Sequence, residues 1–189
     1  MKIWLIRHGL TCLGEEKRYQ GALDEGLSVY GCGALKRADF APPRVYVSPM
    51  LRARETAAIL FPATRQIVVP ELREMDFGVF EGRGWWEMER DPAYRAWVDG
   101  NCLGRCPGGE ERAEFSARVC AAMETLLGNE EEELVIVAHG GTQMAVLERW
   151  GCPARTYYRW QTACGCGWLL DYDRECDEMR ILQELSFVR

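Results

Sequence analysis

The chain has 189 residues, 48% of them hydrophobic, and a formal net charge of −6 at pH 7. This length and composition predict one soluble globular domain over residues 1–189. The acidic balance argues against a nucleic-acid-binding protein, and no apolar run is long enough to span a membrane or to serve as a signal peptide. Nine cysteines, an odd number without a C-x-x-C pair, favour reduced thiols in a cytoplasmic protein over a disulfide framework or a zinc site.

The first predicted element is a short buried strand over Ile3 to Ile6, which leads directly into Arg7-His8-Gly9. The apolar run is too short for a helix and suits the centre of a parallel sheet. Ligands of open α/β sheets bind outside the carboxyl ends of the strands. Arg7 and His8 are therefore expected at such a site.

A long polar loop over residues 10–26 follows, and Ser28 is expected to cap a helix that continues to about Asp39. Residues 44–47 form the second predicted strand. Ser48 and Pro49 then fit the N-cap and first positions of a helix. Arg52 lies in its first turn, where an anion would be stabilised.

Residues 66–69 form the third predicted strand, which Pro70 ends. Residues 72–82 have neither helical nor strand periodicity but mix acids with large apolar side chains. This mixture predicts a loop held against the core, with the carboxylate of Glu74 or Glu81 directed into a pocket. The sequence then predicts short helices at 85–90 and 92–98, a loop at 101–110, a helix at 113–127 and a solvated turn at 130–133.

The second histidine has the same context as the first, because the apolar run Leu134 to Ala138 ends in His139-Gly140. The chain has only two histidines, so two strands that each deliver one could place both rings in a single pocket. The alternative is two unrelated histidines at strand ends.

The sequence next predicts helices at 141–150 and 155–161, followed by a closing hairpin in which 167–172 pairs with 179–185. Strands that alternate with helices predict a three-layer α/β/α sandwich with a mostly parallel central sheet.

The residues brought together in this way suit phosphoryl transfer. Arginine side chains bind phosphate oxygens, and a neutral imidazole is a nucleophile for phosphorus. A carboxyl group, from Glu74 or Glu81, would protonate the leaving oxygen and later activate water. Arg7 and Arg52 could stabilise the transferring group, so no metal or cofactor is expected. The G-x-S-x-G, Walker A and H-E-x-x-H motifs are absent from the sequence.

An ordered set of motifs over residues 2–145 resembles the histidine phosphatase superfamily, also called the phosphoglycerate mutase-like family. The motifs are Arg7-His8-Gly9-x-Thr11, Gln20-Gly21-x-x-Asp24, Ser48-x-x-x-Arg52-Ala53-x-x-Thr56-Ala57, Leu72-x-Glu74-x-x-x-Gly78-x-x-Glu81-Gly82, Pro107-Gly108-Gly109-Glu110 and His139-Gly140-Gly141. Arg-His-Gly alone is a weak signal, whereas the ordered set is specific.

The resemblance implies a phosphoglycerate mutase-like fold and a phosphohistidine mechanism without a metal. By resemblance His8 is the nucleophile, Glu74 the proton donor and Glu81 structural. The other implied site residues are Arg7, Arg52 and His139 around the phosphoryl group, with Gln20, Gly21, Thr11 and Gly140 on the substrate side, where Pro107 to Glu110 also belongs. Gly14 stands where the family often has Asn, a departure expected to remove one contact to phosphate.

The expected activity is hydrolysis of a small phosphorylated metabolite, without a nucleic-acid or membrane partner. The chain resembles short phosphatases, such as the α-ribazole phosphatases, more than the longer phosphoglycerate mutases. A mutase-type phosphotransferase is one alternative. A weakly active phosphatase-like binding or regulatory protein is another, which the departure at Gly14 leaves open.

Overall fold

The structure, a computed structural model, describes residues 1–129 and 132–189, and these residues form a seven-stranded sheet in the order β3-β2-β4-β1-β6-β7-β5. The neighbours β3, β2, β4 and β1 are parallel, and β6 runs antiparallel to β1 and β7. The expected mostly parallel sheet is confirmed. Its strands are β1 (Lys2–Arg7), β2 (Arg44–Val47), β3 (Arg65–Val68), β4 (Glu133–Ala138), β5 (Gly151–Cys152), β6 (Cys166–Asp173) and β7 (Glu178–Ser186).

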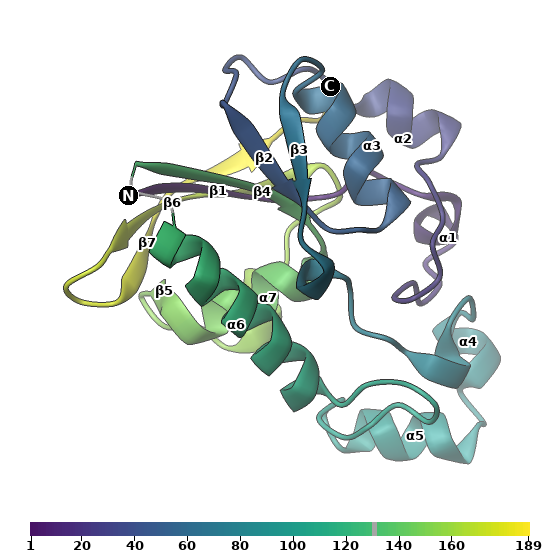
Figure 1. Cartoon of the computed structure of the whole chain (residues 1–189). Helices are drawn as coiled ribbons and strands as arrows, with labels where there is room; N and C mark the ends of the chain where they lie inside the picture. Colours follow the sequence, from purple (N-terminus) through teal and green to yellow (C-terminus); the bar gives the residue numbers. More distant parts are fainter. Residues whose placement is uncertain (130–131) are drawn as a thin grey trace.

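Helices cover both faces of the sheet, with α2 and α3 on one side and α6 and α7 on the other (Figure 1), so the predicted three-layer sandwich is confirmed. The pair α4 and α5 lies away from the sheet, beyond one end of α6 (Figure 1). No helix of the described residues is long and apolar enough to cross a membrane. The helices are α1 (Cys12–Glu15), α2 (Val29–Ala34), α3 (Leu51–Leu60), α4 (Trp85–Met88), α5 (Pro92–Asp99), α6 (Arg112–Asn129) and α7 (Gly140–Trp150).

Strand β4 is covered on both faces, and this explains why its sequence is apolar throughout. Leu134 and Ile136 pack with α6 and α7, while Val135 and Val137 pack on the opposite face with α3. All four are buried, and full burial of each such side chain stabilises the fold by about 1.5–3 kcal/mol. A strand covered on both faces needs apolar residues at every position.

The parallel register places three strand ends side by side. Arg7 of β1 pairs with Ala138 of β4, and the His8 amide donates to the Ala138 carbonyl at 2.9 Å. On the other side of β4, the Ser48 amide donates to the Val137 carbonyl at 3.1 Å. Ser48, His139 and His8 therefore emerge from β2, β4 and β1 at one edge of the sheet.

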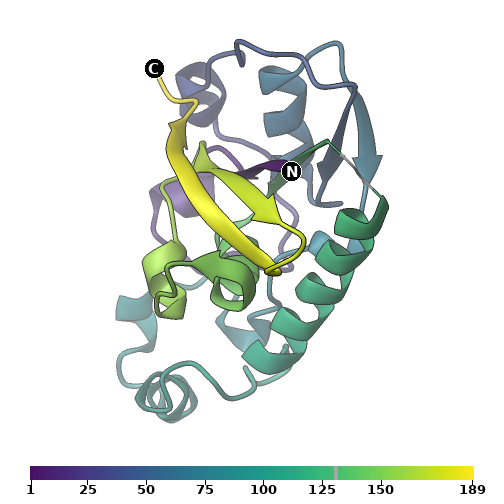
Figure 2. The ribbon, with the colours of Figure 1, turned by 90° about the vertical axis from the view of Figure 1, so that its left-hand side faces the viewer.

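The predicted closing hairpin is confirmed as β6 and β7, which face the viewer in Figure 2. Asp177 closes its turn, because one carboxylate oxygen accepts hydrogen bonds from the Trp150 indole and the Tyr172 hydroxyl, each at 2.8 Å. Strand β5, which pairs with β7, was not predicted, because two residues give no periodicity to detect.

The prediction that Ser48 and Pro49 begin a helix is wrong. Helix α3 begins at Leu51, and Met50 is its N-cap without a side-chain cap. The Leu51 amide donates instead to the Asp24 carboxylate at 2.6 Å, so a distant loop caps the helix. The Ser48 hydroxyl is free for a different contact, described below.

Other boundaries also moved. The helix capped by Ser28 ends at Ala34 instead of near Asp39, because Leu35 is extended and pairs with Val188. Strand β3 begins and ends one residue earlier than expected. The predicted helix at 155–161 is a 3₁₀ turn over Tyr157–Trp160.

Two loops contain more structure than predicted. The polar loop includes α1. Residues 70–82, here called the acid loop, include 3₁₀ turns at Pro70–Leu72 and Gly78–Phe80. Helix α6 is longer at both ends than the predicted 113–127. Of the predicted acidic turn, residues 130–131 lie outside the described residues, and Glu133 already belongs to β4.

Candidate active site

A pocket of about 290 Å³ lies at the carboxyl edge of β1 and β4. Its inner wall includes six of the residues predicted to matter from the sequence, and its outer wall is mainly aromatic. The inner residues are Arg7, His8, Gly14, Gln20, Glu74 and Gly140, and the aromatic ones are Tyr19, Phe77, Trp97, Tyr157 and Tyr158.

The His8 imidazole is held as a neutral base with one free nitrogen. Its Nδ1 lies 2.7 Å from the Gly9 carbonyl oxygen, which can only accept, so Nδ1 carries the proton and Nε2 keeps its lone pair. Burial, followed by the charges of Arg52 and Arg7, keeps the His8 pKa well below its usual value. A neutral ring of this kind is a nucleophile at neutral pH.

The His139 ring lies edge-on to the His8 ring, with 5.2 Å between centroids, as the two strand ends predict. Its Nε2 is 2.6 Å from the Ser48 hydroxyl, which also accepts from the Met50 amide at 3.3 Å. We interpret this contact as a hydrogen bond that the Ser48 hydroxyl donates to Nε2. The His139 ring then carries its own proton on Nδ1. This Nδ1 is buried and has no partner among the described residues.

Both site arginines are tied to the backbone. Arg7 donates from Nη1 to the Thr162 carbonyl at 2.6 Å. Arg52, with no exposed surface, donates from Nη1 to Leu23 and from Nη2 to Gly21, each at 2.8 Å. Each guanidinium keeps a buried Nε without a partner in the described part of the chain. These bonds to the backbone were not predicted from the sequence, and they form because a buried guanidinium requires acceptors for its donors.

Glu74 is the carboxyl group that reaches the pocket. Its two oxygens accept from the amides of Met75 and Gly141, each at 3.0 Å. Burial raises the Glu74 pKa, although these two hydrogen bonds and the charges of Arg52 and Arg7 oppose the shift. Burial therefore shifts Glu74 toward the protonated form that a general acid needs, even without a bound phosphate.

Glu81 has a different position, in keeping with the structural role that the resemblance implies. Its carboxylate accepts from the amides of Gly21, Ala22 and Phe77 at 2.8–2.9 Å and so joins the polar loop to the acid loop. Glu81 is not among the residues that line the pocket.

The remaining predicted residues divide into two groups. Gln20 and Gly140 line the pocket, whereas Thr11 and Gly21 lie behind its wall. The Thr11 hydroxyl accepts from the Gly14 amide at 3.0 Å and donates to the Gln20 side chain at 2.7 Å, so it orients Gln20. A Cβ on Gly14 would lie 3.1 Å from the Thr11 hydroxyl, so Thr11 already occupies the space beside it.

Ser48 and Arg112 were not identified as site residues from the sequence. Ser48 follows a strand end just as the two histidines do, a signal that was available but was interpreted as a helix cap. Arg112 lines the pocket with its guanidinium 4.5 Å from the Tyr157 ring centre. No local pattern marks it, because it arrives from the first turn of α6.

The arrangement suits an anion that carries several oxygens. Arg7, the neutral His8 imidazole and the Glu74 carboxyl group line the pocket. Arg52 and His139 are fully buried and do not line it, but the Arg52 charge acts on His8 and the His139 ring lies edge-on to the His8 ring. Fixed hydrogen-bond donors stabilise charge that develops in a transition state. Within residues 1–129 and 132–189, no three His, Cys, Asp or Glu side chains are grouped as a metal site requires.

Comparisons with known proteins agree with this chemistry. The family model described as Histidine phosphatase superfamily (branch 1) matches residues 3–184. The chain is 31% identical over 155 residues to a Hydrogenobacter thermophilus protein named "Putative phosphoserine phosphatase 2", which covers 77% of this chain and 76% of that one. It is 27% identical over 194 residues to the adenosylcobalamin/alpha-ribazole phosphatase of Escherichia coli K12, over 96% of this chain and 95% of that one. The crystal structure of a phosphoglycerate mutase from Thermus thermophilus matches with a TM-score of 0.76 and 29% identity, over 98% of this chain and 99% of that one.

Proposed function

The chain belongs to the histidine phosphatase superfamily, branch 1, and from this premise we propose that it hydrolyses a small phosphomonoester through a phosphohistidine on His8. The observation that carries the proposal is that three predicted site residues each keep a buried nitrogen without a partner among the described residues: Arg7 Nε, Arg52 Nε and His139 Nδ1. Unpaired buried donors are costly, and a phosphoryl group would satisfy all three at once.

In the first step, the His8 Nε2 lone pair attacks phosphorus and the bond to the ester oxygen breaks. Glu74 gives its proton to the departing oxygen, so the product alcohol leaves neutral. The arginines and His139 hold the non-bridging oxygens as charge builds up on them. His8 is then a phosphoramidate, and its Nδ1 still donates to the Gly9 carbonyl.

In the second step, Glu74 is a carboxylate and acts as a general base. It takes a proton from water while the water oxygen attacks phosphorus, and the phosphorus–nitrogen bond breaks. The electron pair returns to His8 Nε2, phosphate is released, and Glu74 is protonated again. Each residue therefore ends the cycle in its starting state, and no metal is needed for the charge balance.

Several observations support the finer parts of the proposal. One family model over residues 3–184 supports a single histidine phosphatase domain. Nine free thiols support a cytoplasmic location. The aromatic outer wall of the pocket supports a metabolite with an apolar or planar alcohol part, which an α-ribazole-type phosphoester would satisfy.

A phosphoglycerate mutase-type transfer is the second candidate, favoured by the likeness to the Thermus thermophilus structure. We place it below hydrolysis because two of the matched relatives carry phosphatase names, one of them matched over 95% of its length. A phosphatase-like binding protein ranks third, since binding alone would not require the Glu74 carboxyl group in the same pocket as the neutral His8 imidazole.

A panel of phosphorylated metabolites tests the proposal. The purified protein should release inorganic phosphate from at least one of them, and His8→Ala should release none from the same compound. Turnover that survives His8→Ala would refute the phosphohistidine route.

A further inference from the structure

We propose that Glu110 and Arg118 are positioning residues for Glu74. Their ion pair, here called the Arg118–Glu110 clamp, holds the backbone on both sides of Glu74 and so keeps its carboxyl group at the pocket. The inference rests on the proposed function, in which Glu74 moves the protons.

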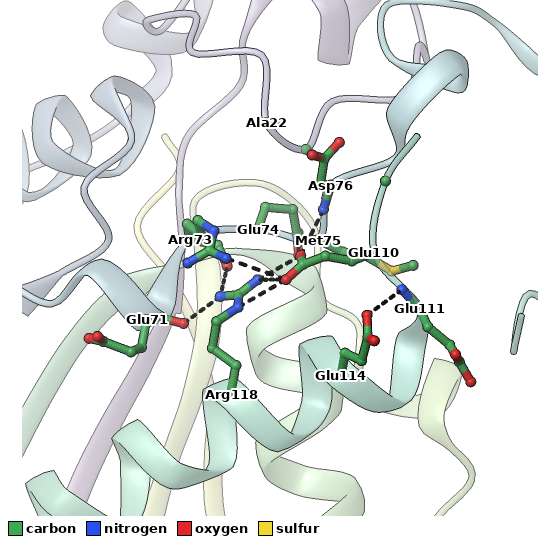
Figure 3. Close-up of polar contacts among 12 residues, drawn as sticks. Ala22, Glu71, Arg73, Glu74, Met75, Asp76, Glu110, Glu111, Glu114 and Arg118 are labelled. Atoms are coloured by element: carbon green, nitrogen blue, oxygen red, sulfur yellow. Dashed lines mark hydrogen bonds and ion pairs between the residues drawn. The ribbon is translucent and has the colours of Figure 1, made fainter. Parts of the chain in front are cut away.

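The clamp is a two-pronged ion pair with little exposure to water. Arg118, on α6, donates from Nε and Nη2 to one Glu110 oxygen at 3.1 and 2.9 Å, and from Nη2 to the other at 2.7 Å (Figure 3). The side chains are 14% and 17% exposed. Pairs of this geometry are directional and poorly screened by salt.

Each partner also forms hydrogen bonds with the backbone of the acid loop. Arg118 Nη1 donates to the carbonyls of Glu71 at 2.6 Å and Arg73 at 3.0 Å, before Glu74 (Figure 3). Glu110 accepts from the Asp76 amide at 3.0 Å, after Glu74, and its own amide donates to the Asp76 carbonyl at 2.9 Å. The clamp therefore spans Glu74 from both sides.

The Glu74 side chain needs such support because burial disfavours its inward orientation at the pocket. A buried carboxyl group gains hydration if it turns outward, and the residues around it form neither a helix nor a strand. Its own hydrogen bonds to the Met75 and Gly141 amides are the direct restraint, and they require the loop to stay in place. The clamp holds the loop in place from α6, which is a long regular helix.

The packing beneath the clamp is equally close. A Cβ on Gly109 would lie 2.3 Å from the Asp76 carbonyl oxygen, and one on Gly78 would lie 2.2 Å from that of Pro107. Only glycine allows the two loops this contact. The segment Pro107 to Glu110, which the resemblance places on the substrate side, thus supports the acid loop, and Glu110 does not line the pocket.

The test uses Glu110→Gln and Arg118→Lys. Glu110→Gln keeps an acceptor for the Asp76 amide but loses the charge, and Arg118→Lys keeps the charge but loses the planar fork. The matched control is Arg149→Lys, which alters an ion pair with Asp177 that is about half exposed and does not touch the acid loop. Folding of each variant is checked by its thermal unfolding midpoint.

Each variant is assayed with an alkyl phosphate and with p-nitrophenyl phosphate, whose leaving group hardly needs a proton. The quantity compared is kcat/KM, which reports formation of the phosphohistidine and not the later water step that Glu74 also assists. Because misplacement of a general acid matters only for poor leaving groups, kcat/KM should fall at least about tenfold on the alkyl ester and much less on the aryl ester. Arg149→Lys should behave like the wild type. Equal losses on both esters, or none, would overturn the positioning role.

A double variant separates this inference from the proposed function. If the clamp acts through Glu74, adding Glu110→Gln to Glu74→Gln should cause no further loss on the alkyl ester, whereas independent roles would multiply the losses. Amide hydrogen exchange over residues 71–77 needs no activity and should be faster in both clamp variants. Unchanged exchange refutes the clamp, while a wild type that is inactive on both esters refutes the proposed function instead.

Discussion

Arg7 and Arg52 show how a residue can be both structural and functional. One terminal nitrogen of Arg7 and both terminal nitrogens of Arg52 donate to backbone carbonyls, which orients each side chain. The remaining Nε is thereby fixed without further cost in side-chain entropy when an anion arrives. The sequence predicted the charge at these positions, but not its attachment to the Gly21 and Thr162 carbonyls.

The first prediction concerns Arg52→Lys. Lysine keeps the positive charge but cannot reach two carbonyls and also present an Nε–H, so transition-state stabilisation should fall by about 2 kcal/mol, or about thirtyfold in kcat/KM. Arg54→Lys is the control, because Arg54 is exposed on the same helix. Steady-state kinetics in which Arg54→Lys is the more damaging change would contradict the role given to Arg52.

The second prediction concerns Glu74 and pH. Burial raises the Glu74 pKa, so the protonated acid is lost only as pH rises through this raised value, and kcat/KM for an alkyl phosphate should then fall. Glu74→Gln should lower kcat/KM, which reports phosphorylation of His8, strongly on alkyl esters and much less on p-nitrophenyl phosphate. The alkaline fall should also disappear in this variant. A pH profile that keeps it, or leaving-group dependence in Glu81→Gln instead, would move the role elsewhere.

At the scale of elements, three parallel strand ends explain most of the site. Strands β1 and β4 could be predicted because each is an apolar run that stops at His-Gly, and adjacent parallel strands bring their ends together. The end of β2 could not be interpreted correctly, because Ser48-Pro49 satisfies the local rule for starting a helix. Asp24 caps α3 from another loop, and no local pattern reports a contact made across the fold.

The third prediction compares two glycines. A Cβ on Gly21 would lie 1.8 Å from the Met75 carbonyl oxygen, so Gly21→Ala should force the polar and acid loops apart and destabilise the protein by about 1–3 kcal/mol. Gly33, inside α2, has nothing within 4 Å of the same position. Gly33→Ala should therefore stabilise the protein by about 0.5–1 kcal/mol. Urea unfolding measures both, and destabilisation by both variants alike would refute the close-contact argument for Gly21.

At the scale of the whole molecule, the resemblance supplied what local patterns could not. Periodicity alone left Glu74 and Glu81 open as the proton donor, whereas the structure places Glu74 at the pocket and Glu81 among loop amides. The aromatic outer wall was beyond prediction, since Tyr19, Trp97 and Tyr157 come from three separate segments. Their convergence depends on the tertiary packing of these segments, which no local pattern reports.

The fourth prediction separates the phosphatase from a mutase. Without a segment to retain a bisphosphate, the phosphoryl group on His8 should pass to water. Incubation with 3-phosphoglycerate and a bisphosphoglycerate primer should therefore yield little 2-phosphoglycerate. Isomerisation much faster than phosphate release, followed by phosphorus NMR, would favour the phosphotransferase instead.

The covalent intermediate provides the most direct measurement of the central claim. The protein is mixed briefly with a labelled phosphoester that it hydrolyses, the reaction is stopped, and the label is located by peptide mapping. The account predicts an acid-labile, base-stable phosphoramidate on His8 that is absent from His8→Ala. Label on any other residue, or wild-type turnover in His8→Ala, would contradict it.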